Sequence, residues 1–183
     1  MKKLLRLTLG LGMLATLALA GSPAHAVSAA GPYYAPPSWD QTLPAATRFI
    51  VLTNMNSEAV LDRETGLVWE QSPSTAPGIW FNASIYCLQL NKGGRKGWRL
   101  PTIQDLASLI DPTVASPGPT LPAGHPFSNV QSSLYWSATT DASNSALAQV
   151  VFFVNGDVLV GRNKNNPGFF AWCVRGGPGV DPQ

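Results

Sequence analysis

Two cysteines are the residues of this chain with the clearest capacity for covalent chemistry. Cys87 and Cys173 are the only cysteines among 183 residues, and 86 positions separate them. An even pair favours a disulfide in an oxidising compartment, whereas two buried free thiols are the alternative. A disulfide closing this loop would stabilise the fold by about 4 kcal/mol, through lost chain entropy in the unfolded state. We therefore predict a structural bridge between Cys87 and Cys173.

Residue types that support catalysis or metal binding are scarce. His25 and His125 are the only histidines, too few for a His-rich metal site, and no nucleophile elbow accompanies His125. Oxygen ligands for calcium could come from a few loop residues, although turn formation also explains them: Asp141, Asn144, Asn155 and Asp157. We predict no catalytic residue, no metal and no cofactor.

A short basic segment is the remaining candidate binding site. Lys92, Arg95 and Lys96 lie within five positions of one another. Clustered positive charge of this kind can contact sulfated or acidic glycans. The alternative is that Lys92 complements the end of a preceding helix while the other two side chains are solvated.

The first 26 residues have the pattern of a secretory signal peptide. Lys2, Lys3 and Arg6 precede an apolar run over residues 7–20, and small-residue cleavage sites end at Ala20 or Ala26. The run is too short to span a bilayer, and an uncleaved anchor is the alternative. Export to the periplasm or cell surface is the expectation, with no stable membrane span after cleavage.

Removing the signal changes the net charge from +2 to −1, because residues 27–183 hold nine Lys and Arg against ten Asp and Glu. A general attraction to nucleic acid is therefore not expected. Composition divides the rest of the chain into an Ala/Pro-rich linker over 27–47, one folded domain over 48–176 and a flexible tail over 177–183.

Hydrophobic periodicity predicts an α+β domain. Helices are expected over 79–91 and over 102–110, the second capped by Thr102 with Asp105 three residues later. Residues 112–130 contain five prolines and read as a long irregular loop. Strands are expected over residues 49–52, 59–62, 67–70, 133–137, 148–154, 158–161 and 169–175, with hairpin turns at 63–66 and 155–157. A further short strand is expected within 97–102, where the chain runs into the second helix.

The same patterns predict which side chains are buried. Trp69, Trp98, Trp136 and Trp172 stand beside aliphatic residues in expected strands and should pack in the core. One face of the first helix should be buried, comprising Trp80, Ala83, Cys87 and Leu88 and widened by Phe81 and Ile85. Arg99 is expected to pair internally with Glu70 or Asp105.

An ordered series of short motifs resembles the Lcl C-terminal domain family, whose named member is part of a bacterial collagen-like adhesin. The resemblance runs from about Val60 to Arg175 and rests on six segments in order: 65–70, 80–87, 97–102, 135–139, 151–153 and 173–175. It implies a C-type lectin-like fold, a small twisted antiparallel sheet flanked by two helices. That fold commonly ties its first helix to its last strand by a disulfide, which agrees with the predicted pair. No collagen-like Gly-X-Y stretch precedes the domain.

Three functions remain open at this point. The leading expectation is a secreted or periplasmic, non-catalytic binding domain that presents loops 112–130 and 138–147 to a glycan or an envelope protein. A structural subunit of a surface apparatus is the first alternative. The second is an enzyme of the formylglycine-generating type, which would need Cys87 or Cys173 as a free thiol. Oligomeric state is not specified by these patterns.

Overall fold

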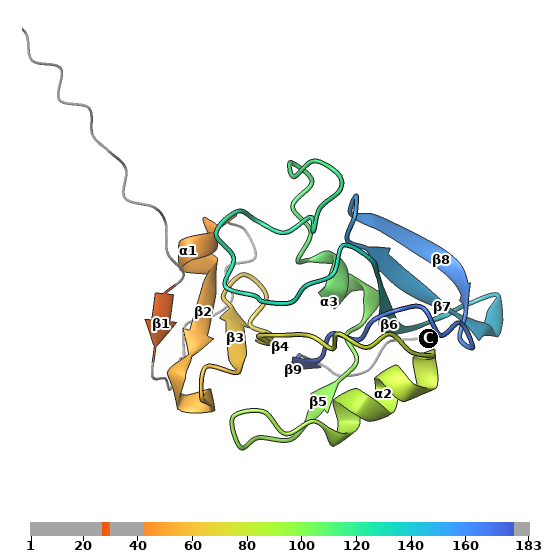
Figure 1. Ribbon diagram of the computed structural model, residues 1–183, viewed down its shortest axis with the longest axis horizontal. Coiled ribbons are helices and arrows are strands. Elements are labelled where there is room, and N and C mark those ends of the chain that lie inside the picture. Colours follow the sequence, from red (N-terminus) through yellow and green to blue (C-terminus); the bar gives the residue numbers. More distant parts are fainter. Residues whose placement is uncertain (1–26, 30–41, 178–183) are drawn as a thin grey trace, which may run out of the picture.

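The computed structural model describes residues 27–29 and 42–177 (Figure 1). The signal peptide, most of the expected linker and residues 178–183 of the expected tail lie outside the described residues. Two elements begin within residues 27–47, the segment expected to be a linker. These are β1 (Val27–Ala29) and α1 (Ala45–Arg48), and β1 pairs in parallel with the first strand of the domain.

A six-stranded sheet runs from the left edge of the molecule in Figure 1, at β1, to its lower centre, at β5. Its order is β1-β2-β3-β4-β9-β5, and all pairs except β1–β2 are antiparallel. The remaining strands are β2 (Phe49–Leu52), β3 (Ala59–Asp62), β4 (Val68–Glu70), β5 (Trp98–Arg99) and β9 (Val174–Arg175). The predicted β3–β4 hairpin is confirmed, and Gly66 in its turn has a φ of 73° that favours glycine.

A second, three-stranded antiparallel sheet lies on the right in Figure 1 and consists of β6 (Leu134–Asp141), β7 (Asn144–Phe152) and β8 (Asp157–Asn163). The predicted turn between β7 and β8 is confirmed. The expected loop over 138–147 is wrong, because β6 and β7 continue through it and leave a tight turn at Ala142 and Ser143. Asp141 stabilises this turn by accepting hydrogen bonds from the backbone N–H and hydroxyl of Ser143.

The last predicted strand, 169–175, is shorter than expected. Only Val174–Arg175 forms β9, while Phe169 and Phe170 make isolated bridges to Gly78 and Tyr135. The chain here passes from the small sheet to the large one, so it cannot remain in a single ladder. It therefore connects the two sheets rather than extending either.

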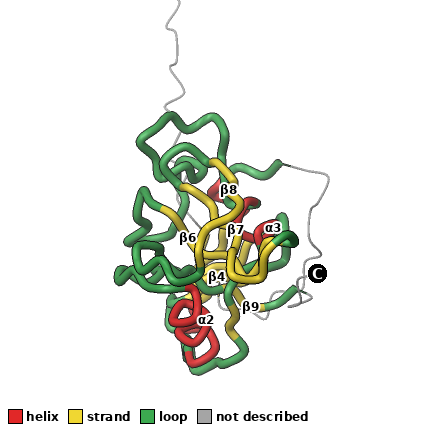
Figure 2. The backbone as a smooth tube through the Cα atoms, turned by 90° about the vertical axis from the view of Figure 1, so that its right-hand side faces the viewer, coloured by secondary structure: helices red, strands yellow, loops and turns green. Residues whose placement is uncertain are grey.

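Both predicted helices are present. α2 (Trp80–Gln89) packs against β5 and β6. α3 (Ile103–Ala107) packs against β6 and β7 and lies beside β7 in Figure 2. A short 3-10 helix, η1 (Thr53–Met55), follows β2. Thr102 and Asp105 form the predicted reciprocal capping box of α3. The predicted extension of α3 to residue 110 is wrong, because Leu109 and Ile110 donate to carbonyls three residues back, in tighter turns.

The buried face of α2 differs from the prediction. Ala83 and Cys87 are buried and Trp80 is half-buried, but Phe81 and Leu88 are each 62% exposed. Periodicity alone misplaced them because α2 is apolar around much of its circumference. Only Ala83 and Cys87, four residues apart, face the sheet closely enough to be covered.

Two hydrophobic clusters form the core, and each contains two of the four predicted core tryptophans. Trp69 and Trp172 belong to one, with their ring centroids 5.7 Å apart, and Trp98 and Trp136 belong to the other. All four are at most 1% exposed, which confirms the prediction. The described part of the chain is therefore an α+β, mainly antiparallel domain, and no helix within it has the length and apolar character to cross a bilayer.

Candidate functional site

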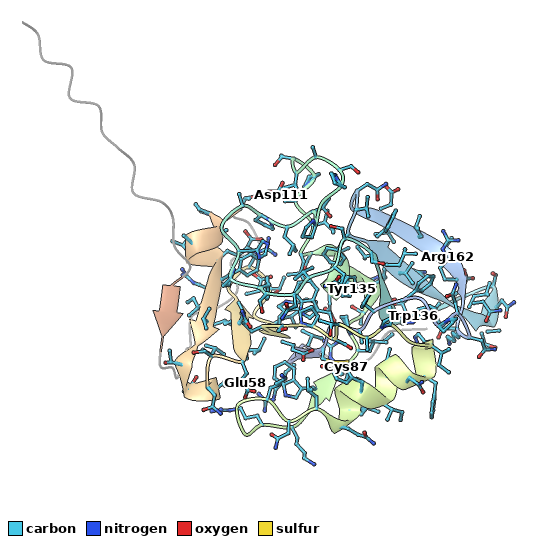
Figure 3. The ribbon with its side chains drawn as sticks, in the orientation of Figure 1. Glu58, Cys87, Asp111, Tyr135, Trp136 and Arg162 are labelled. Carbon is cyan, nitrogen blue, oxygen red and sulfur yellow. A yellow bond between two sulfur atoms is a disulfide. The ribbon has the colours of Figure 1, made fainter. Side chains whose placement is uncertain are left out.

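The disulfide predicted between Cys87 and Cys173 is present. It joins α2 to the residue preceding β9, with the two Cα atoms 5.4 Å apart and both residues fully buried. Figure 3 places Cys87 on the side of α2 that faces the sheet. Because the chain has only these two cysteines, neither is present as a thiol in this structure.

Glu70 lies beside this bridge and is the most unusual ionisable group of the region. Its backbone N–H donates to the carbonyl of Cys173, and its side chain is fully buried. Oε1 accepts a hydrogen bond of 2.7 Å from the hydroxyl of Tyr86, while Oε2 has no hydrogen-bond partner. Burial raises the pKa of Glu70 to about 6, against the opposing effects of Tyr86 and Lys92.

The predicted basic segment does not act as one unit. The ammonium of Lys92 lies 3.8 Å from Oε1 of Glu70 and 4.0 Å from Oε1 of Glu58, so two carboxylates face it. The neighbouring Gly93 donates its N–H to the other carboxylate oxygen of Glu58, at 2.7 Å. Lys92 therefore helps to attach the loop after α2 to the large sheet.

Arg95 and Lys96 are placed differently from Lys92. Arg95 donates from Nη1 to the carbonyls of Asn54 and Gly93, and the side chain of Lys96 is exposed. Arg175 of β9 lies against them and donates from Nε to the carbonyl of Lys96, at 3.0 Å. Within residues 27–29 and 42–177, none of these three cations forms an ion pair.

We call Arg95, Lys96 and Arg175 the basic face. Sequence reasoning missed Arg175 because it lies 79 residues from Lys96. The signal that could have found it is the strand pairing, since β9 lies between β4 and β5 and places Arg175 opposite Trp98. Predicting this pairing requires knowledge of the strand order in the sheet.

A groove adjoins the basic face. It has a volume of about 170 Å³ and is lined by residues of β2, η1, β3 and β4 together with both arginines: Leu52, Asn54, Met55, Leu61, Val68, Arg95 and Arg175. Leu61 and Val68 are paired across β3 and β4, so their side chains lie on the same face of the sheet. The groove thus combines an aliphatic floor with two guanidinium groups.

The other sequence-predicted candidates have structural roles. Arg99 pairs with Asp105 at 2.8 Å, which confirms one of its two expected partners. Asn155 and Asp157 are joined to one another across the β7–β8 turn. The ring of His125 packs near Phe127, and burial lowers its pKa. No cluster of three His, Cys, Asp or Glu residues suited to a metal occurs in the described ranges.

The long loop expected over 112–130 is irregular but firmly attached to the core. Thr120 donates its N–H to the carbonyl of Phe153, and Ser128 donates to that of Gln71. Phe127 is buried, with its ring 4.9 Å from Trp172 and 5.1 Å from Phe49. Much of this loop therefore completes the core.

The chain belongs to the Lcl C-terminal domain family, whose model matches residues 58–175, more than half of the sequence. This match covers the disulfide, Glu70 and the basic face. β1, α1 and β2 precede it. No curated protein matches the chain.

Proposed function

We propose that this protein is an exported, non-catalytic binding domain that recognises an acidic glycan at the cell envelope through the basic face. The observation that carries the proposal is the arrangement of Arg95, Lys96 and Arg175. They lie together without a carboxylate partner in the described part of the chain. The other cation of the segment, Lys92, is opposed by Glu58 and Glu70.

Two features support export. The N-terminal 26 residues have the composition of a signal peptide, and structural disulfides occur mainly in oxidising compartments. A C-type lectin-like fold is part of the proposal. It is supported by the bridge between α2 and the last strand, and by the antiparallel α+β architecture.

The disulfide also supports a non-catalytic role. A formylglycine-generating-type reaction would require a thiol at Cys87 or Cys173, and the bridge occupies both. Neither residue is exposed to solvent. In this proposal their function is to hold α2 against the sheet that carries the basic face.

Retention on immobilised heparin tests the proposal. Arg95→Glu combined with Lys96→Glu should lower the salt concentration needed for elution, because contacts to sulfates are electrostatic and weaken with salt. Arg162→Glu, on β8 in the other sheet, is the charge-matched control for each single variant, Arg95→Glu or Lys96→Glu, and should elute close to the unaltered protein. Equal retention of the double variant and the unaltered protein would refute recognition by this face.

A further inference from the structure

The groove beside the basic face has a chemistry that a sugar does not match. We call Leu61 and Val68, which are paired across β3 and β4, the floor of the groove; Leu52 and Met55 also line it. A sugar ring buried there would leave its hydroxyl groups against aliphatic carbon, which is costly without hydrogen-bond partners. An aliphatic group is the natural occupant of this floor.

Two guanidinium groups border the same floor. Arg95 uses Nη1 for the carbonyls of Asn54 and Gly93, and Arg175 uses Nε for the carbonyl of Lys96. These bonds hold each side chain in place while leaving its remaining N–H donors to a ligand. Arginine binds carboxylates particularly well because its planar donors match the two oxygens of the group.

The position of Arg175 follows from the sheet register. Leu61 pairs with Val68, and Val68 pairs with Arg175, so the three side chains lie on one face of adjacent strands. Arg95 reaches the same groove from the loop after α2. A ligand that filled the floor would therefore meet positive charge at its border.

We propose that this groove binds the free carboxyl terminus of a polypeptide that ends in an aliphatic residue. The terminal carboxylate would lie between Arg95 and Arg175, and the last side chain would rest on Leu61 and Val68. This inference rests on the proposed binding role and assigns a peptide ligand to a subsite of that face.

Size favours a peptide terminus over a long-chain fatty acid. The groove volume is about 170 Å³, and a cavity of about 150 Å³ accommodates a molecule the size of benzene. One aliphatic side chain fits such a space, whereas most of a long acyl chain would remain exposed to water. A C-terminal leucine or valine presents a carboxylate and one such side chain from a single carbon atom.

Fluorescence anisotropy with a labelled pentapeptide ending in Gly-Gly-Leu tests the proposal on the full exported protein. The peptide with a free carboxylate should bind saturably, and its C-terminal amide should bind about tenfold more weakly or worse. Free hexanoate should compete only weakly. Equal affinity of acid and amide, or binding of hexanoate without binding of the peptide, would overturn the assignment.

Variants separate the groove from general electrostatic attraction. Arg175→Gln and Arg95→Gln should each lower the affinity for the free-acid peptide about tenfold. Lys96→Gln removes an adjacent charge outside the groove and should change this affinity less than about threefold. Leu61→Lys should abolish peptide binding by occupying the floor while adding positive charge. An equal loss in all three charge variants would contradict the proposal.

Heparin retention of the same proteins distinguishes the two proposals. The Leu61→Lys variant should be retained on immobilised heparin at least as well as the unaltered protein, because it adds a positive charge. We therefore expect this variant to lose peptide binding and to keep its retention on heparin. Heparin retention without saturable peptide binding by the unaltered protein overturns the groove assignment and leaves the proposed function standing.

Discussion

The hydroxyl of Tyr86 donates a hydrogen bond of 2.7 Å to Oε1 of Glu70, a carboxylate that is fully buried. This bond links α2 to β4, and Tyr86 immediately precedes Cys87, which forms the covalent link to Cys173. It also lowers the pKa of Glu70, but burial has the larger effect and raises that pKa from 4.5 to about 6. The carboxyl group is therefore more readily protonated in the folded protein than in the unfolded chain.

Protonation of Glu70 should make the stability of the domain depend on pH. Because the folded-state pKa is the higher one, the stabilisation is fully present below about pH 4.5 and is lost as the pH rises through 6. The difference corresponds to about 2 kcal/mol. This difference can be measured by urea unfolding of the unaltered protein and of the Glu70→Gln variant, each at pH 4.5 and at pH 7. The variant should gain about that amount relative to the unaltered protein at the higher pH.

Tyr86→Phe is the control for this assignment. It removes a hydrogen bond that favours the charged carboxylate, so the pKa of Glu70 should rise further and the transition should move to higher pH. A constant stability difference between Glu70→Gln and the unaltered protein at both pH values would contradict the account.

Loss of the disulfide should destabilise the domain strongly. It closes a loop with a sequence separation of 86, for which lost chain entropy predicts about 4 to 5 kcal/mol. The double variant Cys87→Ala with Cys173→Ala should therefore unfold at a lower urea concentration than the unaltered protein. The unaltered protein is measured both with and without reductant for comparison. Intact mass after alkylation under denaturing conditions provides the check: no alkylation should occur before reduction and two additions after it.

Breaking the ion pair between Arg48 and Asp62 should be costly because Asp62 is completely buried. Arg48 donates to both carboxylate oxygens at 2.9 Å, and Arg48→Met would leave that charge without its cation. We expect a loss of about 3 to 5 kcal/mol in the free energy of unfolding. Glu64→Gln removes the second, partly exposed partner of Arg48 and should cost less than about 1 kcal/mol. Similar losses in the two variants would refute this ranking.

Two neighbouring glycines provide a matched pair of substitutions. Gly93 and Gly94 both have positive φ, 58° and 67°, but a Cβ at Gly93 would overlap the backbone and side chain of Met55, whereas one at Gly94 would meet nothing within 4 Å. Gly94→Ala should cost about 1 kcal/mol from backbone strain alone. Gly93→Ala should cost at least about 2 kcal/mol more, since Met55 is buried and overpacking adds to the strain. Equal midpoint temperatures of thermal unfolding for the two variants would argue against this packing of Gly93 on Met55.

Local patterns predicted the elements whose determinants lie close together in the chain. The capping box of α3 and the β3–β4 hairpin each depend on residues within a few positions. The core tryptophans were predictable because their aliphatic neighbours mark buried strands. Even the disulfide required only the count of cysteines and the expected compartment.

Features that depend on the tertiary arrangement were not predictable in this way. The two exposed residues of α2, Phe81 and Leu88, have the hydropathy of core residues, and only the packing of the sheet shows that they are uncovered. Arg175 joins Arg95 and Lys96 because β9 is inserted between strands formed much earlier in the chain. The ammonium of Lys92 faces two carboxylates instead, and neither of them is adjacent to it in sequence.

The central position of β9 has a consequence for how the domain is made. β4 and β5 are joined only through β9, so the large sheet stays divided into two parts until the ribosome has passed Arg175. Until then, Trp69 and Trp98 lack the strand between them, and Cys87 lacks its partner. Such long-range pairing slows folding. The large sheet therefore closes only after β9 has been made, and a chain ending before Val174 would leave apolar surface exposed to chaperones and proteases.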